Sequence, residues 1–540
     1  MTWLGTRRAT AAAIVISLAL AACSLRLGFI TDDYAFRAKL AHDHAPAELF
    51  TFQTGDPTTN AALVRIGRLP WWAAPDLEIH FLRPLTGELF AAEAAIFDDA
   101  AVGYHAVALG LLALLYLGIA VLYRTVLPRP TATVALLVFG LAGAHTEAYA
   151  WLAANHALLG ALAGVWALAL YVRAPGRWRW LALVPLALGL AASETTLGVV
   201  PLWCGLAWSR PRLDGIAPVV VGVAYLAIYV ALGAGTRGSG GYHDPLSDPV
   251  GFASLVGTRL PILLGDAALA IPSGLAMLGH VPVLALAGLL AVAFVGYAGR
   301  ALPRPLLWFV LGGVLAVLPG VAGYPTGRVL LVPDIAFAAA LGAILMARPV
   351  RVPAIAIVIA VAHLLVAPLF GLHELRALAR RGDVSDRAAA EVAALVAPGS
   401  RAILIASADP YVFLYPRGVL AATHPGVVTC WSVLSAARSR HRLTRTGERT
   451  FTLELLDQPI AAGFDGLFRS ADRPFHAGDR FEQCGAMIAV AALDPRGLPT
   501  RLDVAYQRDL ADPKLAFLVE RDHRLERFTF PEPGSSVELP

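Results

Sequence analysis

Charged residues are scarce in this chain of 540 residues: Asp, Glu, Lys and Arg make up 15%, whereas hydrophobic residues make up 57%. The mean hydropathy is +0.64. This composition excludes an ordinary soluble protein and is typical of a chain that crosses a membrane many times. The net charge is only +4, and the arginines stand in short clusters. A nucleic-acid partner is therefore not indicated either.

Cysteine is also scarce. The four cysteines contain no Cys-x-x-Cys and no Cys/His cluster at metal spacing, so the sequence predicts no zinc or iron–sulfur site. Cys430 and Cys484 share the polar C-terminal region, and they could form a disulfide if that region lies outside the cytoplasm. Two separate thiols are the alternative.

Long hydrophobic runs, in contrast, are abundant. About eleven runs are near the length that crosses the hydrocarbon core, or slightly short of it. They cover residues 10–30, 100–123, 131–149, 152–172, 178–193, 195–209, 215–234, 281–299, 305–323, 327–346 and 353–370. Leu20-Ala-Ala-Cys23 could also be a lipoprotein cleavage site, but apolarity resumes through Ile30 and extends that run to spanning length.

Arginines stand in every second loop between these runs. They are Arg7, Arg8, Arg124, Arg129, Arg173, Arg177, Arg179, Arg210, Arg212, Arg300, Arg304, Arg348 and Arg351. The positive-inside rule then places the N-terminus in the cytoplasm. This alternation requires that residues 252–278, which contain Arg259 and Asp266, do not cross completely. We interpret that segment as an external amphipathic or re-entrant helix.

The topology predicts a multi-pass α-helical protein of the inner (plasma) membrane. Residues 1–370 would form the transmembrane domain, with external loops at 31–99, which holds interfacial helices, and at 235–280. Residues 371–540 would form an external domain on the periplasmic or extracellular face. Its alternating stretches predict a β-rich α+β fold after a short helix near the membrane. They are residues 402–405, 450–455, 487–491 and 527–530.

Two further features of these external regions have competing interpretations. Trp71 and Trp72 are more typical of interfacial anchors on a helix that lies on the membrane than of a functional site. The arginine-rich run from Arg438 to Arg449 favours a solvated loop, with contact to an acidic glycan or a lipid headgroup as the alternative.

Asp32 and Asp33 stand where the chain leaves its first hydrophobic run. Two adjacent carboxylates at a membrane boundary are costly to desolvate, so their position indicates chemistry more than architecture. Arg83, beside Pro84, has apolar neighbours that favour a buried ion pair or a phosphate contact.

Other polar side chains fall at predicted external helix ends. They are His145, Glu147, His156, Glu194 and Arg328. Each could be a helix cap or part of a buried hydrogen-bonded pair. Because all of them approach the same membrane face as Asp32 and Asp33, we expect one cavity to collect them.

Five motifs stand in a characteristic order: Asp32-Asp-Tyr34, Phe81-Leu-Arg-Pro-Leu85, His145-Thr-Glu147, Ser193-Glu-Thr195 and Arg328-Val-Leu-Leu-Val-Pro333. As an ordered set they resemble the C-type (GT-C) membrane glycosyltransferases. The resemblance is strongest to the branch with the transmembrane and tetratricopeptide-repeat O-mannosyltransferases and related bacterial proteins. The resemblance covers roughly residues 10–370. The chain departs from that branch in lacking the lysine of its Ser-Lys-Glu motif, and residues 371–540 show no repeat of about 34 residues.

The resemblance implies an enzyme that transfers a sugar, with inversion, from a polyprenyl-phosphate donor to a glycan, lipid or protein acceptor on the external face. Asp32 or Asp33 would be the general base. Arg328, or else Arg83, would bind the departing phosphate. The remaining substrate-binding residues would be His145, Glu147, His156 and Glu194.

Adjacent carboxylates could also hold a divalent cation, but without a further cluster of ligands they predict no defined metal site. Two other functions remain open on the sequence alone. One is a transporter or lipid flippase, whose path would be lined by polar helix ends. The other is a catalytically silent envelope scaffold, which the missing lysine would suit.

Overall fold

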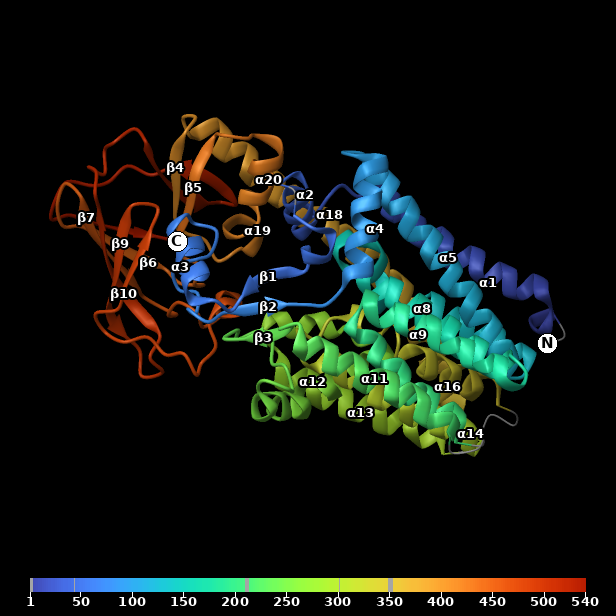
Figure 1. The fold of residues 1–540 in the computed structure, drawn as a ribbon. Helices are drawn as coiled ribbons and strands as arrows, with labels where there is room; N and C mark the ends of the chain where they lie inside the picture. Colours follow the sequence, from blue (N-terminus) through green and yellow to red (C-terminus); the bar gives the residue numbers. More distant parts are fainter. Residues whose placement is uncertain (1–2, 43, 209–212, 301, 348–352) are drawn as a thin grey trace.

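The computed structural model describes residues 3–42, 44–208, 213–300, 302–347 and 353–540. Arg210, Arg212, Arg348 and Arg351 lie outside these residues. The chain forms a bundle of long helices joined to a β-rich domain, and the N-terminal helix begins at the end of the bundle remote from that domain (Figure 1). The predicted class, a polytopic helical membrane protein with a C-terminal β-rich domain, is confirmed.

The α-helices are α1 Arg7–Ala21, α2 Asp32–Ala41, α3 Pro57–Arg65, α4 Pro84–Phe97, α5 Ala101–Val126, α6 Arg129–Gly140, α7 Thr146–Ala150, α8 Asn155–Arg173, α9 Leu183–Ala192, α10 Val199–Ala207, α11 Leu213–Ala231, α12 Pro249–Leu269, α13 Val281–Gly299, α14 Arg304–Ala316, α15 Leu318–Val321, α16 Asp334–Met346, α17 Pro353–Val361, α18 Ala367–Leu395, α19 Pro410–Phe413 and α20 Pro416–Thr423. The strands are β1 Thr51–Thr54, β2 Glu78–His80, β3 Gly235–Arg237, β4 Ser400–Ala406, β5 Val428–Ser435, β6 His441–Arg445, β7 Thr450–Leu455, β8 Arg480–Gln483, β9 Ala486–Leu493, β10 Pro499–Tyr506, β11 Leu515–Arg521, β12 Arg524–Arg527 and β13 Ser536–Leu539.

Fewer helices could cross a membrane than the sequence predicted. Within the described residues, 8 helices are long and apolar enough, or 9 if α6 and the bent segment Gly143–Ala150 count as one span. The predicted spans 178–193 and 195–209 are not among these helices. Their α-helices, α9 and α10, have 10 and 9 residues, and each directly follows a 3₁₀ turn, Gly176–Ala182 or Glu194–Gly198.

The bend after α6 packs closely against α18. The two helical segments meet at 50°. A Cβ atom on Gly143 would lie 2.3 Å from the backbone oxygen of Ala367 on α18. Only glycine allows this close approach, so α18 crosses the break in the predicted span 131–149.

The segment predicted as an external or re-entrant helix over 252–278 consists of α12 and a short 3₁₀ turn, Ser273–Leu278. By length and composition α12 is one of the possible spans. Near its middle, however, Arg259 donates hydrogen bonds to the backbone oxygens of Gly323 at 2.6 Å and of Val321 at 3.1 Å. The next residue, Tyr324, stacks on Phe464 of the C-terminal domain. Arg259 on α12 therefore lies close to the contact between the bundle and the C-terminal domain, and the partial crossing of this segment stays a prediction.

The C-terminal domain contains two sheets. A six-stranded antiparallel sheet has the order β13-β6-β7-β10-β9-β8, and a four-stranded sheet has the order β12-β11-β4-β5. β4 pairs in parallel with both β5 and β11. Phe451, Leu453 and Leu455 alternate along β7 and are buried, so one face of that strand contributes to the core.

Two predictions for this domain were wrong. Residues 441–445 form strand β6 instead of a solvated loop, and β12 ends at Arg527, so Phe528–Phe530 is not a strand. The expected short helix near the membrane is also longer: α17, a π-helical turn at Ala362–Val366 and α18 form one continuous helix to Leu395.

The loop of residues 31–99, called the first loop below, packs into the C-terminal domain. Trp71 and Trp72 are fully buried, so the prediction that they anchor the chain at the membrane is wrong. The indole N–H of Trp71 donates to the backbone oxygen of Leu434 at 2.9 Å. The indole N–H of Trp72 donates to the backbone oxygen of Asp465 at 3.0 Å. The Arg469 guanidinium donates to the backbone oxygen of Trp72 at 2.7 Å. Loop and domain therefore share one hydrophobic core.

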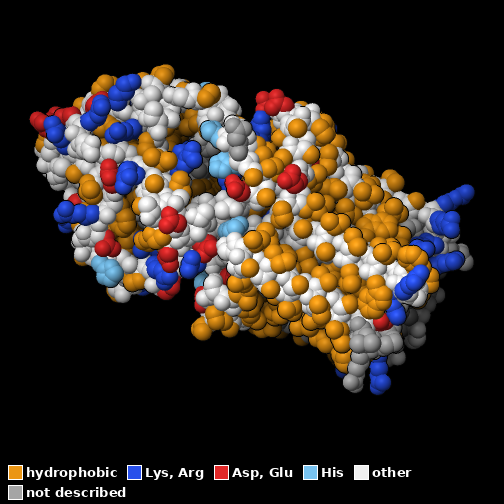
Figure 2. Space-filling view, in the orientation of Figure 1, with side chains coloured by type: hydrophobic (Ala, Val, Ile, Leu, Met, Phe, Trp, Pro, Cys, Tyr) orange, Lys and Arg blue, Asp and Glu red, His pale blue; other side chains and the backbone are white. Residues whose placement is uncertain are grey.

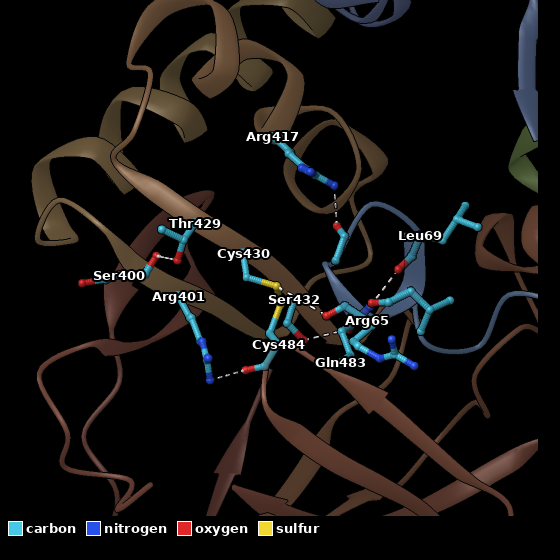
Figure 3. The surroundings of a disulfide bond; sticks show 12 residues. Arg65, Leu69, Ser400, Arg401, Arg417, Thr429, Cys430, Ser432, Gln483 and Cys484 are labelled. Atoms are coloured by element: carbon cyan, nitrogen blue, oxygen red, sulfur yellow. Dashed lines mark hydrogen bonds between the residues drawn. A yellow bond between two sulfur atoms is a disulfide. The ribbon is translucent and has the colours of Figure 1, made fainter. Parts of the chain in front are cut away.

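A disulfide joins the two sheets. It links Cys430 on β5 to Cys484 beyond β8, with the Cα atoms 5.7 Å apart (Figure 3). The first loop closes over it: the Cys484 N–H donates to Arg65 O at 3.0 Å. Gly67 adopts a φ of +68°, and a Cβ atom there would lie 2.0 Å from the oxygen of Trp431. The chain thus requires glycine at this contact.

Replacing both Cys430 and Cys484 by serine should destabilise the domain, because the crosslink closes a long loop with a sequence separation of 54. We expect a loss of about 2–4 kcal/mol, seen as a lower unfolding temperature of the purified protein. Cys23→Ser is the matched control, since Cys23 is an exposed free thiol. Equal unfolding temperatures for the double variant and the control would contradict a structural role for the bond.

Candidate active site

The candidate site begins at the turn before α2. Thr31 has a φ of +51°, which a β-branched residue rarely adopts. The turn is held by Asp33, whose two carboxylate oxygens accept hydrogen bonds from the backbone N–H of Ile30 at 2.8 Å and of Ala153 at 2.7 Å. Asp33 is fully buried. Asp33 therefore joins the end of the first predicted span to the 3₁₀ turn Leu152–Ala154 that precedes α8.

Asp32, its neighbour, is half-buried and engages no hydrogen-bond donor among the described residues. The positive charges that act on it are those of Arg328 and Lys39. Lys39 itself is held by backbone oxygens, with Thr51 O at 2.6 Å and Leu49 O at 3.0 Å. Of the two aspartates, only Asp32 has a carboxylate free to take part in chemistry.

Arg328 is the central cation of the site. Its guanidinium lies over the ring of Trp151, 5.0 Å from the centroid, and within the described part of the chain it forms no ion pair or hydrogen bond. Its charge acts on Asp32, on His156 and on Glu194. A half-buried arginine without a carboxylate partner is suited to bind an anion.

Arg83 is already paired. Its Nε donates to Glu194 Oε2 at 2.8 Å, a second hydrogen bond joins Nη2 to Oε1, and the guanidinium lies over Phe81 at 4.3 Å. The Glu194 carboxylate neutralises the Arg83 charge that would otherwise attract a phosphate. Of the two interpretations of Arg83 from the sequence, the structure has the buried ion pair.

His156 lies beside this pair. Its Nδ1 is 3.0 Å from Ser193 Oγ, and its ring meets that of Phe50 edge to face. The charges of Arg83 and Arg328 both act on it. The structure therefore brings together five of the eight predicted residues around one polar site: Asp32, Arg83, His156, Glu194 and Arg328.

His145 and Glu147 engage other partners, contrary to the expected single cavity. His145 Nε2 lies 2.8 Å from Asp334 Oδ2 inside the bundle. Glu147 forms an ion pair at 3.5 Å with Arg381 on α18, which also contacts Glu374 at 2.9 Å. Asp334 and Arg381 lie nearly two hundred residues or more beyond His145 and Glu147 in the sequence. The His145-Thr-Glu147 motif therefore gave no indication of these partners.

Burial acts differently on the two aspartates. It raises the pKa of Asp32 to about 6, against the charges of Arg328 and Lys39, which lower it. It raises the pKa of Asp33 further, to about 8, although two backbone donors oppose the rise. Asp32 is thus mostly ionised at neutral pH while retaining enough basicity to accept a proton, which suits a general base.

Three residues of the site were missed from the sequence. Lys39 follows Asp32 by seven positions and so shares its helix face, a spacing that could have revealed it. Tyr242 and Tyr415 are both close enough to Asp32 and Arg328 for their charges to interact. They come from the loop before α12 and from the C-terminal domain, and nothing local in the sequence links them to α2.

The possible divalent cation stays a prediction. Among the described residues there is no group of three or more His, Cys, Asp or Glu side chains that could hold a metal ion. What the arrangement offers instead is one free carboxylate and one free guanidinium, with a histidine and an ion pair beside them. Such a site can accept a proton and stabilise an anion in the same reaction.

No protein-family model matches the sequence, and no curated protein does. Among solved structures, the oligosaccharyltransferase of Archaeoglobus fulgidus in the apo form aligns with 79% of this chain at 12% identity and a TM-score of 0.43. Tethered by a disulfide to an acceptor peptide with the NVT sequon, it aligns with 80% at 12% identity and a TM-score of 0.40. In both cases the match spans 64% of that protein's length.

ArnT of Cupriavidus metallidurans bound to undecaprenyl phosphate aligns with 78% of this chain and 89% of its own length. The identity is 12% and the TM-score is 0.34.

The two aspartates should differ in their effect on stability. Asp33→Ala leaves two buried backbone N–H groups without acceptors, so we expect a loss of about 2–4 kcal/mol. Asp32→Ala removes no hydrogen bond and should cost less than about 1 kcal/mol. Thermal unfolding of both variants in the same detergent measures the difference. Equal losses would show that Asp33 does not hold this turn.

Proposed function

We propose that the protein is a membrane glycosyltransferase that uses a sugar donor linked to a polyprenyl phosphate. The observation that carries the proposal is a carboxylate without a donor, Asp32, beside a guanidinium without a carboxylate partner, Arg328, where the helical bundle meets the domain. The ordered GT-C-like motifs support it, since both residues belong to that set. A lipid-linked donor would present its phosphate at this level of the membrane.

The geometry supports a single displacement. The acceptor hydroxyl loses its proton to the Asp32 carboxylate as its oxygen attacks the anomeric carbon of the donor sugar. The bond from that carbon to the phosphate oxygen breaks on the opposite side, so the configuration inverts. The negative charge that grows on the departing phosphate meets the Arg328 guanidinium, which can donate two hydrogen bonds to it.

The missing lysine has a local consequence for this mechanism. Glu194 occupies the Ser193-Glu-Thr195 segment and is neutralised by Arg83 from the first loop. Because Glu194 neutralises the Arg83 charge, Arg328 would bind the phosphate without help from Arg83. His156 and the Arg83–Glu194 pair are then placed to bind hydroxyl groups of the sugar or the acceptor.

We also propose that the site faces the periplasm or the cell exterior. Lys and Arg side chains gather at the end of the bundle remote from the domain (Figure 2), which the positive-inside rule assigns to the cytoplasm. The domain at the other end carries the Cys430–Cys484 disulfide, a bond typical of oxidising compartments.

One observation favours a transporter as the second candidate. His145, Asp334, Asp266 and His363 lie close together inside the bundle, and Asp266, Asp334 and His363 line a small cavity between α6, α12, α16 and the π-helical turn. Buried ionisable groups in a membrane can mark a path for protons or ions. Incorporation of radiolabelled sugar into an acceptor distinguishes the enzyme from the transporter and from a silent scaffold.

Asp32→Asn should abolish sugar transfer from a polyprenyl-phosphate donor in membranes, because the amide cannot accept the proton. In the wild-type protein, kcat/KM should rise with pH up to about 6 and then level off, since the pKa of Asp32 is about 6 and only the ionised form is active. Glu88→Gln, at a carboxylate on α4 outside the site, is the control. Full transfer by Asp32→Asn at wild-type protein levels would refute the role of Asp32.

Arg328→Gln should lower kcat for transfer by roughly a hundredfold or more, because a charge-assisted contact to the departing phosphate is lost. Arg328→Lys should recover only part of the rate, since an ammonium cannot form the bidentate contact. Initial rates at saturating donor give these values. A Gln variant with the wild-type rate would exclude Arg328 as the phosphate ligand.

A further inference from the structure

A groove in the C-terminal domain lies apart from the candidate active site. Its volume is about 550 Å³, within the range of small-molecule sites. It is lined by residues that follow β4, β5 and β11, together with Asp457 and the hairpin turn between β11 and β12. The arginine-rich run that the sequence singled out begins on its wall, with Arg438 and Arg440.

The topology of the four-stranded sheet explains why a groove forms there. β4, β5 and β11 are parallel, so their carboxyl ends share one edge of the sheet. From β4 the chain passes to β5 on one side, and it later enters β11 on the other side of β4. The order of strands therefore reverses between β4 and β11. In sheets of this kind, ligands bind outside the carboxyl ends at the point of reversal.

Three arginines and three acidic side chains, Asp457, Glu520 and Asp522, line the groove, but of these arginines only Arg440 is held by a carboxylate at hydrogen-bond distance. Arg440 is held by Asp457 at 3.1 and 3.2 Å. Arg438 is exposed and forms no ion pair among the described residues, and Arg521 has its nearest carboxylate, Glu526, only at 4.0 Å. Two guanidinium groups are thus available to an anion on the wall of one groove.

The other lining groups suit hydroxyls. Glu520 accepts a hydrogen bond from Ser407 Oγ at 2.5 Å and keeps a second carboxylate oxygen, and Asp457 and Ser439 lie on the wall near Arg440. No aromatic side chain other than histidine lines the groove. A nucleotide base would therefore find no stacking surface, whereas a sugar ring needs only polar partners.

We propose that this groove binds an anionic saccharide, with its carboxylate or phosphate on Arg438 and Arg521 and its hydroxyls on Glu520, Asp457 and Ser439. From Ser407 in the groove, the chain continues through α19 to Tyr415, which is close enough to Asp32 for their charges to interact. One short segment of chain, residues 407–415, therefore links the groove to the transfer site. Use of the groove to hold an acidic glycan acceptor rests on the proposed function, whereas binding itself does not.

The test is calorimetric titration of the full-length protein in phosphatidylcholine nanodiscs with tetragalacturonic acid, and with maltotetraose as a neutral probe of matched length. We expect the acidic probe to bind at least tenfold more tightly, and its affinity to fall as salt is raised. Failure to bind tetragalacturonic acid, or equal binding of both probes, would overturn the proposal.

Variants locate the binding. Arg438→Gln combined with Arg521→Gln should weaken binding of tetragalacturonic acid by about tenfold or more. Arg527→Gln, at the other end of the same β-hairpin, should leave it unchanged, and unfolding temperatures check that each variant is folded. Undiminished binding by the double variant would refute the site. Asp32→Asn should bind as the wild type does, so that failure of sugar transfer and failure of saccharide binding are distinguished.

Discussion

The arrangement of the site depends on the Asp33 carboxylate. It accepts hydrogen bonds from the backbone N–H of Ile30, at the end of the first predicted span, and from that of Ala153, which lies 120 residues beyond Asp33 and just before α8. The contact closes the turn in which Thr31 adopts a positive φ, directly before Asp32. A buried carboxylate that satisfies two backbone donors stabilises one arrangement and leaves the alternatives with unpaired groups. Of the two adjacent aspartates, Asp33 thus has a structural role, and Asp32 is the one available for chemistry.

The rest of the site comes from segments that the C-terminal domain holds together. The first loop contributes Arg83, the loop before α12 contributes Tyr242, and the domain contributes Tyr415. Backbone contacts such as Gly240 N to Gly466 O at 3.0 Å tie these segments to the domain. The continuous helix from Pro353 to Leu395 connects the domain rigidly to the bundle, beside α2 and α20 (Figure 1).

Local patterns were sufficient for some of this architecture. Alternation predicted β7 over the same residues that form it, and apolar runs located α5, α8 and α13, because each depends on its own periodicity and burial. Patterns failed where a distant segment decides the outcome. The burial of Trp71 and Trp72 requires the domain, and the close packing at Gly143 involves α18. The pairing of His145 with Asp334 depends on packing inside the bundle.

The contact between Trp71 and Leu434 also has a consequence for biogenesis. These residues are 363 positions apart in the chain. At ordinary rates of synthesis the later one emerges roughly 20–70 s after the earlier one. During that interval two large indole groups and the glycine turn at Gly67 have no partner to cover them. The first loop therefore contributes half of a hydrophobic core before the other half is synthesised. The chain is most exposed to misassembly before its last 110 or so residues have been made.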